Sequence, residues 1–253
     1  MPKISAAIIT YNEEKNIERC LSSLSTIADE IIVVDSYSDD QTEAICKKYN
    51  VKFVQHPFEG YSQQKNYALS NASFDVVLSL DADEALSEKL AASIKNIKSD
   101  FRKQGYYFNR KTNFCGQWIK YSGWYPDRKL RLVNRLHGEW GGSNPHEKFI
   151  MHEGDAATGF LEGDLLHYSY YKIDEFYKKS YQYAELAAKD LFKKGRTCNY
   201  LNLWVHTIFK FVQTYFLKWG FLDGINGFQI AKISTQATFH KYQMLRYLHY
   251  SSN

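Results

Sequence analysis

Short apolar runs alternate with amphipathic segments through the amino-terminal part of the chain. The apolar runs lie at residues 4–10, 30–34, 51–55 and 76–80, and polar positions follow each of them. Nearly continuous apolar runs of this length are typical of strands buried in a mostly parallel sheet. Between them, helices are predicted at residues 17–24, from Asp39 or Asp40 as the cap to about Tyr49, and at residues 62–70. This alternation predicts an α/β fold with a doubly wound, mostly parallel sheet.

The pattern changes in the middle of the chain. Residues 105–113 alternate in polarity, which predicts another strand. Residues 116–125 are rich in Trp, Tyr and Gly, a composition that suits either an ordinary core or the apolar face of a sugar. In the extended segment that follows, Arg128 and Arg131 are expected on opposite sides.

The last third of the chain has helical periodicity and no strand-like run. Helices are predicted at residues 177–194, 201–222 and 229–250, the first of them stopped by Gly195. The middle helix is amphipathic, so it can pack on the rest of the chain, pair with a second copy or lie in a membrane interface. No apolar run reaches the roughly 18 residues expected of a segment that spans a bilayer.

Composition and charge divide the chain in the same way. Its 253 residues are 44% hydrophobic and 24% charged, which allows one large globular domain or a domain with an appendage. Residues 1–170 hold 20 Lys and Arg against 23 Asp and Glu, whereas residues 171–253 hold 12 against 5 and 19 of the 41 aromatic residues. We therefore predict a domain at 1–170 and a basic, aromatic-rich helical extension at 171–253. The basic excess favours an anionic partner, either a membrane surface or a nucleic acid.

Cysteine usage favours a reducing cytoplasm. The four cysteines show no C-x-x-C spacing, and the opening MPKISAAIITYNEE has no long apolar signal region. The sequence contains neither a G-x-G-x-x-G nor a G-K-[ST] loop, so a dinucleotide site or a P-loop is not expected.

Polar residues follow the predicted strands at their carboxyl ends. Thr10, Tyr11, Asn12 and Glu13 follow the first strand, Asp35 the second, and Asp81 and Asp83 the fourth. Open α/β sheets bind ligands at this edge, so these residues are expected to converge there. Two carboxylates this close repel each other unless a cation lies between them, and a hard divalent cation bound to phosphate oxygens is a natural partner. Alternatively, one aspartate caps a helix that starts near Ala85 and the other is solvated.

These segments carry a family resemblance. IITYNEEKNIERCLSSL, IIVVDSYSDDQT, QQKNYAL and VVLSLDADE resemble the nucleotide-sugar half of family 2 glycosyltransferases, which have the GT-A fold. YPDRKLRLVNR, NPHEKF, LLHYSY and GFLDGINGFQIA resemble a subgroup typified by lipopolysaccharide core β-1,4-glucosyltransferases of the WaaE type. The resemblance covers essentially the whole chain. It implies that residues 1–115 bind the nucleotide sugar and that residues 116–170 form the acceptor half.

The resemblance also implies roles for particular residues on the donor side. The base and ribose of a nucleotide-diphosphate sugar would be contacted by the residues at the first two strand ends, with Thr10 beside Tyr11, Asn12, Glu13 and Asp35. Lys65 would reach a phosphate or pair with the carboxylates of this edge; otherwise it is a solvated helix lysine. Asp81 is expected near the ribose and metal-bound water. Asp83 would bind the Mg²⁺ or Mn²⁺ that bridges the two phosphates, and His167 would complete that metal site or serve as a hydrogen-bonded structural residue.

On the acceptor side, the resemblance points to a base and an arginine. Glu147 is the expected base that deprotonates the acceptor hydroxyl, with His146 as the alternative. The competing interpretation is a surface glutamate in a salt bridge. One arginine, Arg128 or Arg131, is assigned to phosphate or acceptor contact, and Arg128 is our choice.

Together these expectations describe a metal-dependent, inverting hexosyltransferase. The resemblance implies glucose from UDP-glucose as the donor and a lipopolysaccharide core sugar or related lipid-linked envelope glycan as the acceptor. The enzyme would be cytoplasmic and peripheral on the inner face of the cytoplasmic membrane, with no nucleic-acid partner. The alternatives are a non-catalytic, nucleotide-binding membrane scaffold and a transferase with a different polysaccharide or protein acceptor. A nucleotidyltransferase is not favoured, because the sequence has no Gly-rich phosphate loop near its amino terminus.

Overall fold

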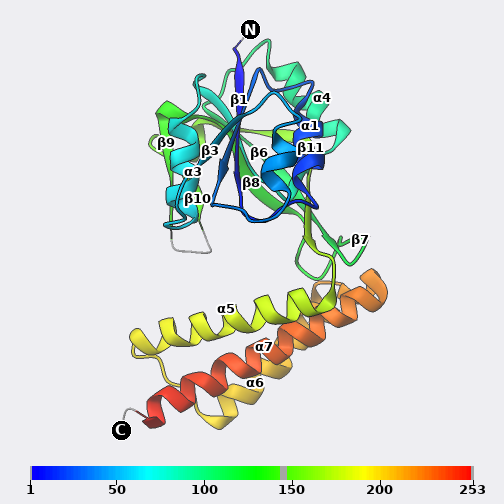
Figure 1. Cartoon of the computed structure of the whole chain (residues 1–253). Coiled ribbons are helices and arrows are strands. Elements are labelled where there is room, and N and C mark those ends of the chain that lie inside the picture. The colour runs from blue at the N-terminus through cyan, green and yellow to red at the C-terminus, as the bar shows by residue number, and fades with distance from the viewer. Residues whose placement is uncertain (1, 143–146, 252–253) are drawn as a thin grey trace. The chain divides into compact units, whose positions relative to one another are not determined.

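The computed structural model describes residues 2–142 and 147–251, which form two compact units (Figure 1). The first, here called the sheet unit, contains Met1–Arg110 and Asp127–Tyr168. The second, the helical unit, contains Lys111–Pro126 and Ser169–Asn253. The predicted division of labour between residues 1–115 and 116–170 stays a prediction, because it concerns ligands.

Four parallel strands form one half of the sheet. Their order is β3 (Lys52–Gln55), β2 (Glu30–Asp35), β1 (Ile4–Thr10) and β4 (Val76–Asp81). All three neighbouring pairs are parallel, with β1 between β2 and β4. These strands lie where the apolar runs of the sequence predicted them.

Antiparallel pairing dominates the other half of the sheet. The order continues from β4 through β8 (Asp127–Asn134), β6 (Gly105–Phe114) and β11 (Thr158–Tyr170) to β5 (Glu84–Leu86), and the short β7 (Gln117–Trp118) pairs with the end of β6. A separate two-stranded sheet joins β9 (Gly138–Gly141) to β10 (Lys148–Met151). Short 3-10 turns occupy Arg135–His137 and Asp155–Ala157.

Both faces of the sheet are covered. Successive side chains of a buried strand point in opposite directions, so each strand contributes to a core cluster on either face. In β1, Ile4, Ala6 and Ile8 belong to one core cluster, which they share with α1 (Ile17–Leu24) and α4 (Glu88–Ile97). The neighbouring residues Ala7 and Ile9 belong to a second cluster with α3 (Tyr61–Ser70) and the β9–β10 pair. The short helix α2 (Thr42–Cys46) adds Cys46 to the first cluster.

Two predicted helices of the sheet unit need correction. The helix expected near Ala85 does not begin there: Glu84–Leu86 is a strand paired antiparallel with β11, and α4 begins at Glu88. Ser87 caps it by accepting a hydrogen bond from the Leu90 amide at 3.2 Å, so neither aspartate is the cap. The helix expected to reach Tyr49 ends at Cys46, although an Asp40 carboxylate oxygen does accept from the Thr42 amide at 2.9 Å.

The helical unit is built around the last helix of the chain. α5 (Ile173–Lys193) and α6 (Tyr200–Phe211) both contact α7 (Gly224–Ser251). The helix predicted at 201–222 is interrupted: α6 is followed by a π-helical segment, Val212–Leu217, and a 3-10 turn, Gly220–Asp223. Among the residues that the structure describes, no helix is both long and apolar enough to cross a membrane.

Asp223 ties residues 117–122 to the helices. Its carboxylate, which is buried, accepts hydrogen bonds from the backbone amides of Lys120 and Tyr121 at 3.1 and 3.0 Å. The Asn226 side-chain amide donates to the Gln117 side-chain carbonyl at 2.9 Å. The aromatic segment predicted as a core or a sugar platform contributes Trp124 to a cluster with Phe176, so a core role is observed for that residue.

Candidate active site

Polar residues meet at the carboxyl edge of the parallel strands. The register of β1 and β2 places Thr10 opposite Asp35, and that of β1 and β4 places Ile9 opposite Asp81. Strand ends that are far apart in sequence are therefore neighbours along one edge, as the sequence predicted.

The loops after β1 and β2 hold each other through Ser38. The Asn12 amide donates to the Ser38 hydroxyl at 2.8 Å, and the Ser38 amide donates to an Asp35 carboxylate oxygen at 2.8 Å. The Ser38 hydroxyl in turn donates to the other Asp35 oxygen. Asp35 is fully buried and fixes Ser38 in the loop after β2, and Ser38 in turn holds Asn12 in the loop after β1. Ser38 had no role in the sequence analysis, because a single serine in a polar loop gives no signal.

The residues at the end of β1 have different surroundings. Tyr11 is 58% exposed, which leaves its ring available to a planar ligand. Glu13 accepts from the side-chain amide of Asn16 at 2.7 Å, and its own amide donates to the Thr42 hydroxyl at 2.9 Å. Thr10 is buried, and its hydroxyl oxygen has no hydrogen-bond partner in the structure.

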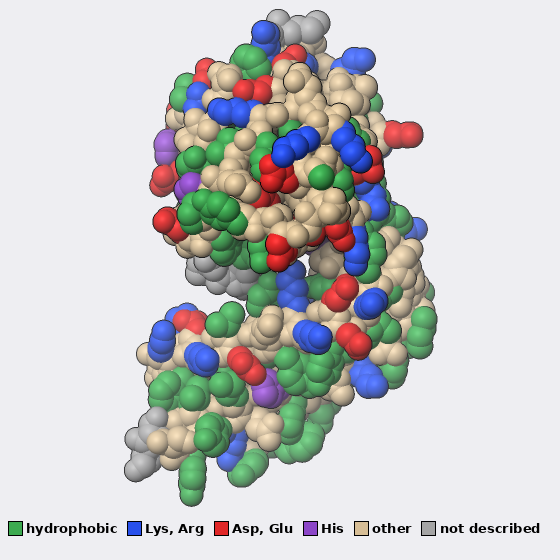
Figure 2. Space-filling model, viewed as in Figure 1, with side chains coloured by type: hydrophobic (Ala, Val, Ile, Leu, Met, Phe, Trp, Pro, Cys, Tyr) green, Lys and Arg blue, Asp and Glu red, His purple; other side chains and the backbone are tan. Residues whose placement is uncertain are grey.

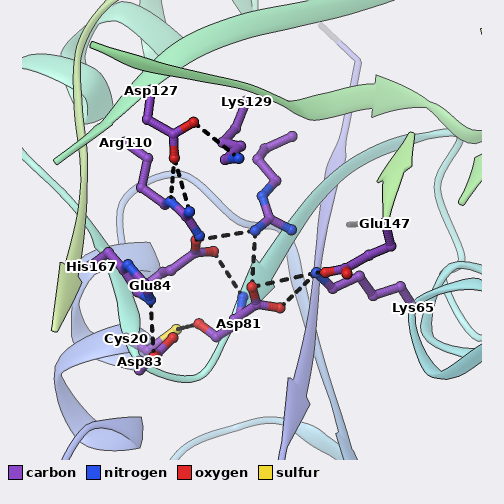
Figure 3. Close-up of polar contacts among 11 residues, drawn as sticks. Cys20, Lys65, Asp81, Asp83, Glu84, Arg110, Asp127, Lys129, Glu147 and His167 are labelled. Carbon is purple, nitrogen blue, oxygen red and sulfur yellow. Dashed lines mark hydrogen bonds and ion pairs between the residues drawn. The ribbon is translucent and has the colours of Figure 1, made fainter. Parts of the chain in front are cut away.

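Five charged residues form a contiguous group that we call the ion cluster: Lys65, Asp81, Glu84, Arg131 and Glu147 (Figure 3). Lys65 Nζ lies 3.0 Å from an Asp81 carboxylate oxygen and 2.9 Å from Glu147 Oε1. Arg131 Nη2 lies 2.9 Å from the other Asp81 oxygen and 3.1 Å from Glu84 Oε1. Asp81 is therefore held between two cations.

The ion cluster is largely removed from water. The Lys65 and Arg131 side chains are 1% and 4% exposed. Burial by itself raises the pKa of Asp81, but the charges of Lys65 and Arg131 outweigh it and hold that pKa well below its usual range. Burial likewise acts to lower the pKa of Arg131, but Glu84 and Asp81 raise it above its usual value. Asp81 and Arg131 are therefore both charged at neutral pH.

Trp140, in β9, supports both cations. Lys65 Nζ lies 4.6 Å and the Arg131 guanidinium carbon 5.2 Å from the centre of its ring. Both contacts are within the range of cation–π attraction. α3 also anchors on this strand, because the Asn66 side-chain amide donates to the Trp140 carbonyl at 2.8 Å. Lys65 is thus fixed at the buried side of α3 and is not the solvated helix lysine of the alternative interpretation.

Glu147 presents one unused oxygen. Its Oε1 pairs with Lys65, whereas Oε2 is buried without a hydrogen-bond partner. The side chain is 14% exposed, so the salt bridge that it makes is not a surface one. His146, the alternative base, lies outside the described residues.

Asp83 and His167 form a second pair beside the cluster. His167 Nε2 is 3.2 Å from Asp83 Oδ2, and the Tyr168 amide donates to the Asp83 carbonyl at 2.9 Å. One carboxylate oxygen and one imidazole nitrogen are suitable ligands for Mn²⁺ or Mg²⁺. Within the described ranges, no group of three or more His, Cys, Asp or Glu is placed to hold a metal ion. The pair thus offers two ligand atoms for a divalent cation.

The two arginines considered in the sequence have different surroundings. Arg131 points into the ion cluster, whereas Arg128 is exposed and lies over the Phe160 ring at 5.3 Å. Arg110 adds a further cation to the cluster: it is 3.6 Å from Glu84 and 2.9 Å from Asp127. Sequence reasoning named neither Arg110 nor Glu84 as a site residue, although Glu84 directly follows Asp83.

Tyr61 is another residue that the sequence analysis missed. It begins α3 after Gly60, whose φ of 144° suits glycine, and it is 40% exposed. Burial raises the pKa of the Tyr61 phenol, and the negative charges of Asp81, Glu147 and Asp83 raise it further. The Tyr61 phenol is therefore neutral at physiological pH.

The chain is similar to known glycosyltransferases. The sequence pattern described as "Glycosyl transferase family 2" matches residues 5–153, more than half of the chain. The chain belongs to glycosyltransferase family 2. It is 33% identical over 261 residues to an uncharacterized glycosyltransferase of Rickettsia typhi, covering 98% of this chain and 88% of the relative. Membership, the mixed sheet and the helical carboxyl-terminal region confirm the predicted GT-A fold with its extension.

One relative has a more specific name. The lipopolysaccharide core biosynthesis glycosyltransferase LpsC of Rhizobium meliloti is 29% identical over 236 residues, which cover 90% of this chain and 87% of that protein. Among solved structures, residues 1–349 of S. aureus TarS in complex with UDP-GlcNAc align with 99% of this family 2 chain and 92% of their own, at 14% identity and a TM-score of 0.48.

Proposed function

We propose that this family 2 glycosyltransferase transfers a hexose from a UDP-sugar, glucose from UDP-glucose, to a lipopolysaccharide core sugar or a related lipid-linked envelope glycan. The reaction would invert the anomeric configuration and take place at the inner face of the cytoplasmic membrane. The observation that carries the proposal is the shared contact of Lys65 with Asp81 and Glu147. It joins the donor edge of the sheet to the segment expected to bind the acceptor.

Glu147 is the proposed base. Its Oε2 is buried without a donor, and a buried acceptor of this kind is normally satisfied by a hydrogen bond. An acceptor hydroxyl would supply that bond and lose its proton to Oε2 as its oxygen attacks the anomeric carbon. Lys65 holds the Glu147 side chain in place while the bond from the anomeric carbon to the nucleotide diphosphate breaks.

Asp83 and His167 would hold a divalent cation. When bound, Mg²⁺ or Mn²⁺ supplies Lewis-acid stabilisation of the leaving diphosphate. The protein contributes the Asp83 carboxylate and His167 Nε2, which already lie 3.2 Å apart. We assign Asp81 to donor orientation, because Lys65 and Arg131 already neutralise its charge.

The loops after β1 and β2 would bind the nucleoside. Tyr11 is exposed enough to cover the base, and Asn12, Glu13 and the buried Asp35 fix the shape of the loop beneath it. Arg128 is assigned to the acceptor, because it is exposed on β8 at a distance from the ion cluster. Tyr61 is added to this list as a donor to a substrate oxygen, because its phenol remains protonated.

The deciding experiment is calorimetric binding of UDP-, GDP- and CMP-sugars, with Mn²⁺ and with a chelator, followed by transfer to a lipopolysaccharide core acceptor. Metal-dependent binding of UDP-glucose and a product of inverted configuration support the proposal. Binding without transfer to any glycan supports the scaffold alternative, and transfer only to a polysaccharide or protein replaces the acceptor.

A further inference from the structure

The helical unit exposes a strip of large apolar side chains along α6 and the segment that follows it. Trp204, Ile208 and Phe209 are 54%, 61% and 52% exposed on α6, and Leu217 and Trp219 are 62% and 57% exposed beyond it. We call the exposed apolar residues from Tyr200 to Ile225 the apolar strip. Hydrophobic side chains protrude from the helical unit in Figure 2. Large apolar side chains exposed in such number mark an interaction site.

One face of α6 is apolar and exposed. Positions 204, 205, 208, 209 and 212 lie on one helical face and are exposed, although all are apolar. The opposite face of α6 is buried at Leu203 and Thr207, at 3% and 7% exposure, and Thr214 in the π-helical segment is 2% exposed. The Thr207 hydroxyl donates to the Leu203 carbonyl at 2.7 Å and so needs no water. α6 thus exposes a face of large apolar residues while Leu203 and Thr207 pack inward.

Small residues allow the close packing behind the strip. A Cβ on Gly227 would lie 1.8 Å from the Gly220 carbonyl oxygen, and one on Gly220 would lie 2.6 Å from the Thr214 carbonyl oxygen. Ala231 and Ala237 are buried on the same helix, α7. Ile230, Ile233 and Leu245 are buried on α7 as well, so the unit has an apolar interior and the strip is exposed in addition to it.

Charge around the strip has a single sign. Residues 191–253 contain eight Lys and Arg and one acidic residue, Asp223. Asp223 is buried and accepts hydrogen bonds from Lys120 and Tyr121 amides, so it presents no charge at the surface. Burial lowers the pKa of Lys210, and the charges of Lys218 and Lys241 lower it further. The excess of Lys and Arg in this segment favours an anionic partner surface.

We propose that the apolar strip inserts into the interfacial layer of an anionic lipid bilayer, with α6 lying in the membrane plane. The 12 residues of α6 are about 18 Å long at 1.5 Å per residue, too short to cross a hydrocarbon core of about 30 Å. Tryptophans and lysines beside an apolar face suit the boundary between acyl chains and headgroups. The inference rests on the membrane association in the proposed function and names the surface responsible.

The test is flotation of the full chain with vesicles of phosphatidylcholine alone or mixed with phosphatidylglycerol. The chain should float with the mixed vesicles and less with phosphatidylcholine, and added salt should weaken binding. Ile208→Gln should lower partition about tenfold, because it removes one inserted aliphatic side chain. Leu186→Gln is the matched control: Leu186 is 55% exposed on α5, outside the strip, and its replacement should leave partition unchanged.

Several outcomes would overturn the inference. These are failure of the unaltered chain to float, an equal loss in both variants, or a concentration-dependent dimer that Ile208→Gln dissolves while vesicles are not bound. If circular dichroism shows that Ile208→Gln is misfolded, Val205→Gln, at a 54% exposed position of the same face, replaces it. UDP-sugar binding is measured on the same samples. If the unaltered chain binds vesicles but no UDP-sugar, the proposed reaction is contradicted and the membrane inference is not.

Discussion

Lys65 Nζ lies 2.9 Å from Glu147 Oε1, although the two residues are 82 positions apart in the sequence. Lys65 belongs to α3 and Glu147 directly precedes β10, so the contact joins the two sides of the candidate site. Because Lys65 is also 3.0 Å from Asp81, one buried cation fixes the spacing of the proposed donor and acceptor carboxylates.

Removing this cation should affect both stability and activity. Lys65→Met leaves Asp81 and Glu147 without their partner, so we expect the free energy of unfolding to fall by about 3 kcal/mol and transfer to be lost. Lys47→Met is the control, because Lys47 pairs with Glu43 at the surface, where the side chains are 70% and 40% exposed. That pair should contribute under about 1 kcal/mol. Urea unfolding of both variants measures the difference, and equal stabilities would contradict the importance of the cluster.

Glu147→Gln tests the base. The amide keeps the size of the side chain but cannot take a proton, so we expect transfer to fall by about 10²-fold to 10⁴-fold while donor binding is retained. Glu139→Gln, at an exposed position of β9, should leave both unchanged. Single-turnover rates and calorimetry separate the two effects. Full transfer by Glu147→Gln would move the role of base to another residue.

Asp83→Ala tests the metal site. The substitution removes the carboxylate that lies 3.2 Å from His167, and we expect the Mn²⁺-dependent part of UDP-sugar binding to disappear. Asp75→Ala is the comparison, because Asp75 is 58% exposed at the other end of β4 and pairs with Arg135. Titration of Mn²⁺ followed by its electron paramagnetic resonance signal provides a readout independent of turnover. Unchanged Mn²⁺ affinity would exclude Asp83 as a ligand.

The low pKa of Asp81 predicts that the free energy of unfolding depends on pH in the acid range. Its pKa is lower in the folded chain than in the unfolded chain, so its ionised form favours folding. This contribution is complete above the unfolded-state pKa of about 3.9 and is lost as the pH falls below it toward the folded-state value. The difference in unfolding free energy between the unaltered chain and Asp81→Asn should therefore shrink below about pH 4. A difference that is constant from pH 3 to pH 7 would show that Asp81 is not ionised preferentially in the folded state.

Gly227→Ala tests the close contact in the helical unit. The added Cβ would lie 1.8 Å from the Gly220 carbonyl oxygen, so the backbone must shift, and we expect a loss of about 1–3 kcal/mol. Gln236→Ala, at an exposed position of α7, should cost nothing and can gain slightly from helix propensity. Thermal unfolding followed by circular dichroism compares the two. A fully stable Gly227→Ala would contradict the tight contact between α7 and the preceding turn.

The strands, and the sheet edge where their polar ends gather, could be predicted from the sequence, because both depend on local pattern. A run such as Val76–Asp81 is apolar on both faces, which specifies a strand covered by helices on both sides. Once the strands are parallel, their polar ends must lie at one edge. The helix expected at Ala85 was wrong because pairing with β11, a strand about 80 residues later, overrides local preference.

The partners of the charged groups required the tertiary structure. Arg128 and Arg131 are separated by three positions and have the same chemistry, and only the packing of β8 against β4 directs Arg131 to Asp81. Tyr61 and Trp140 lie in no motif, and their relevance arises from what surrounds them in space.

The sequence by itself determined the kind of sheet, the edge at which polar residues gather and the helical, basic character of the last third of the chain. These features follow from periodicity and composition, which are local properties of each segment. Only the tertiary structure decided which cation neutralises Asp81, how Glu147 is held, and that α6 buries Thr207 while exposing Ile208. The reason is physical: burial and ion pairing depend on distances between side chains, and folding sets those distances between residues that are remote along the chain.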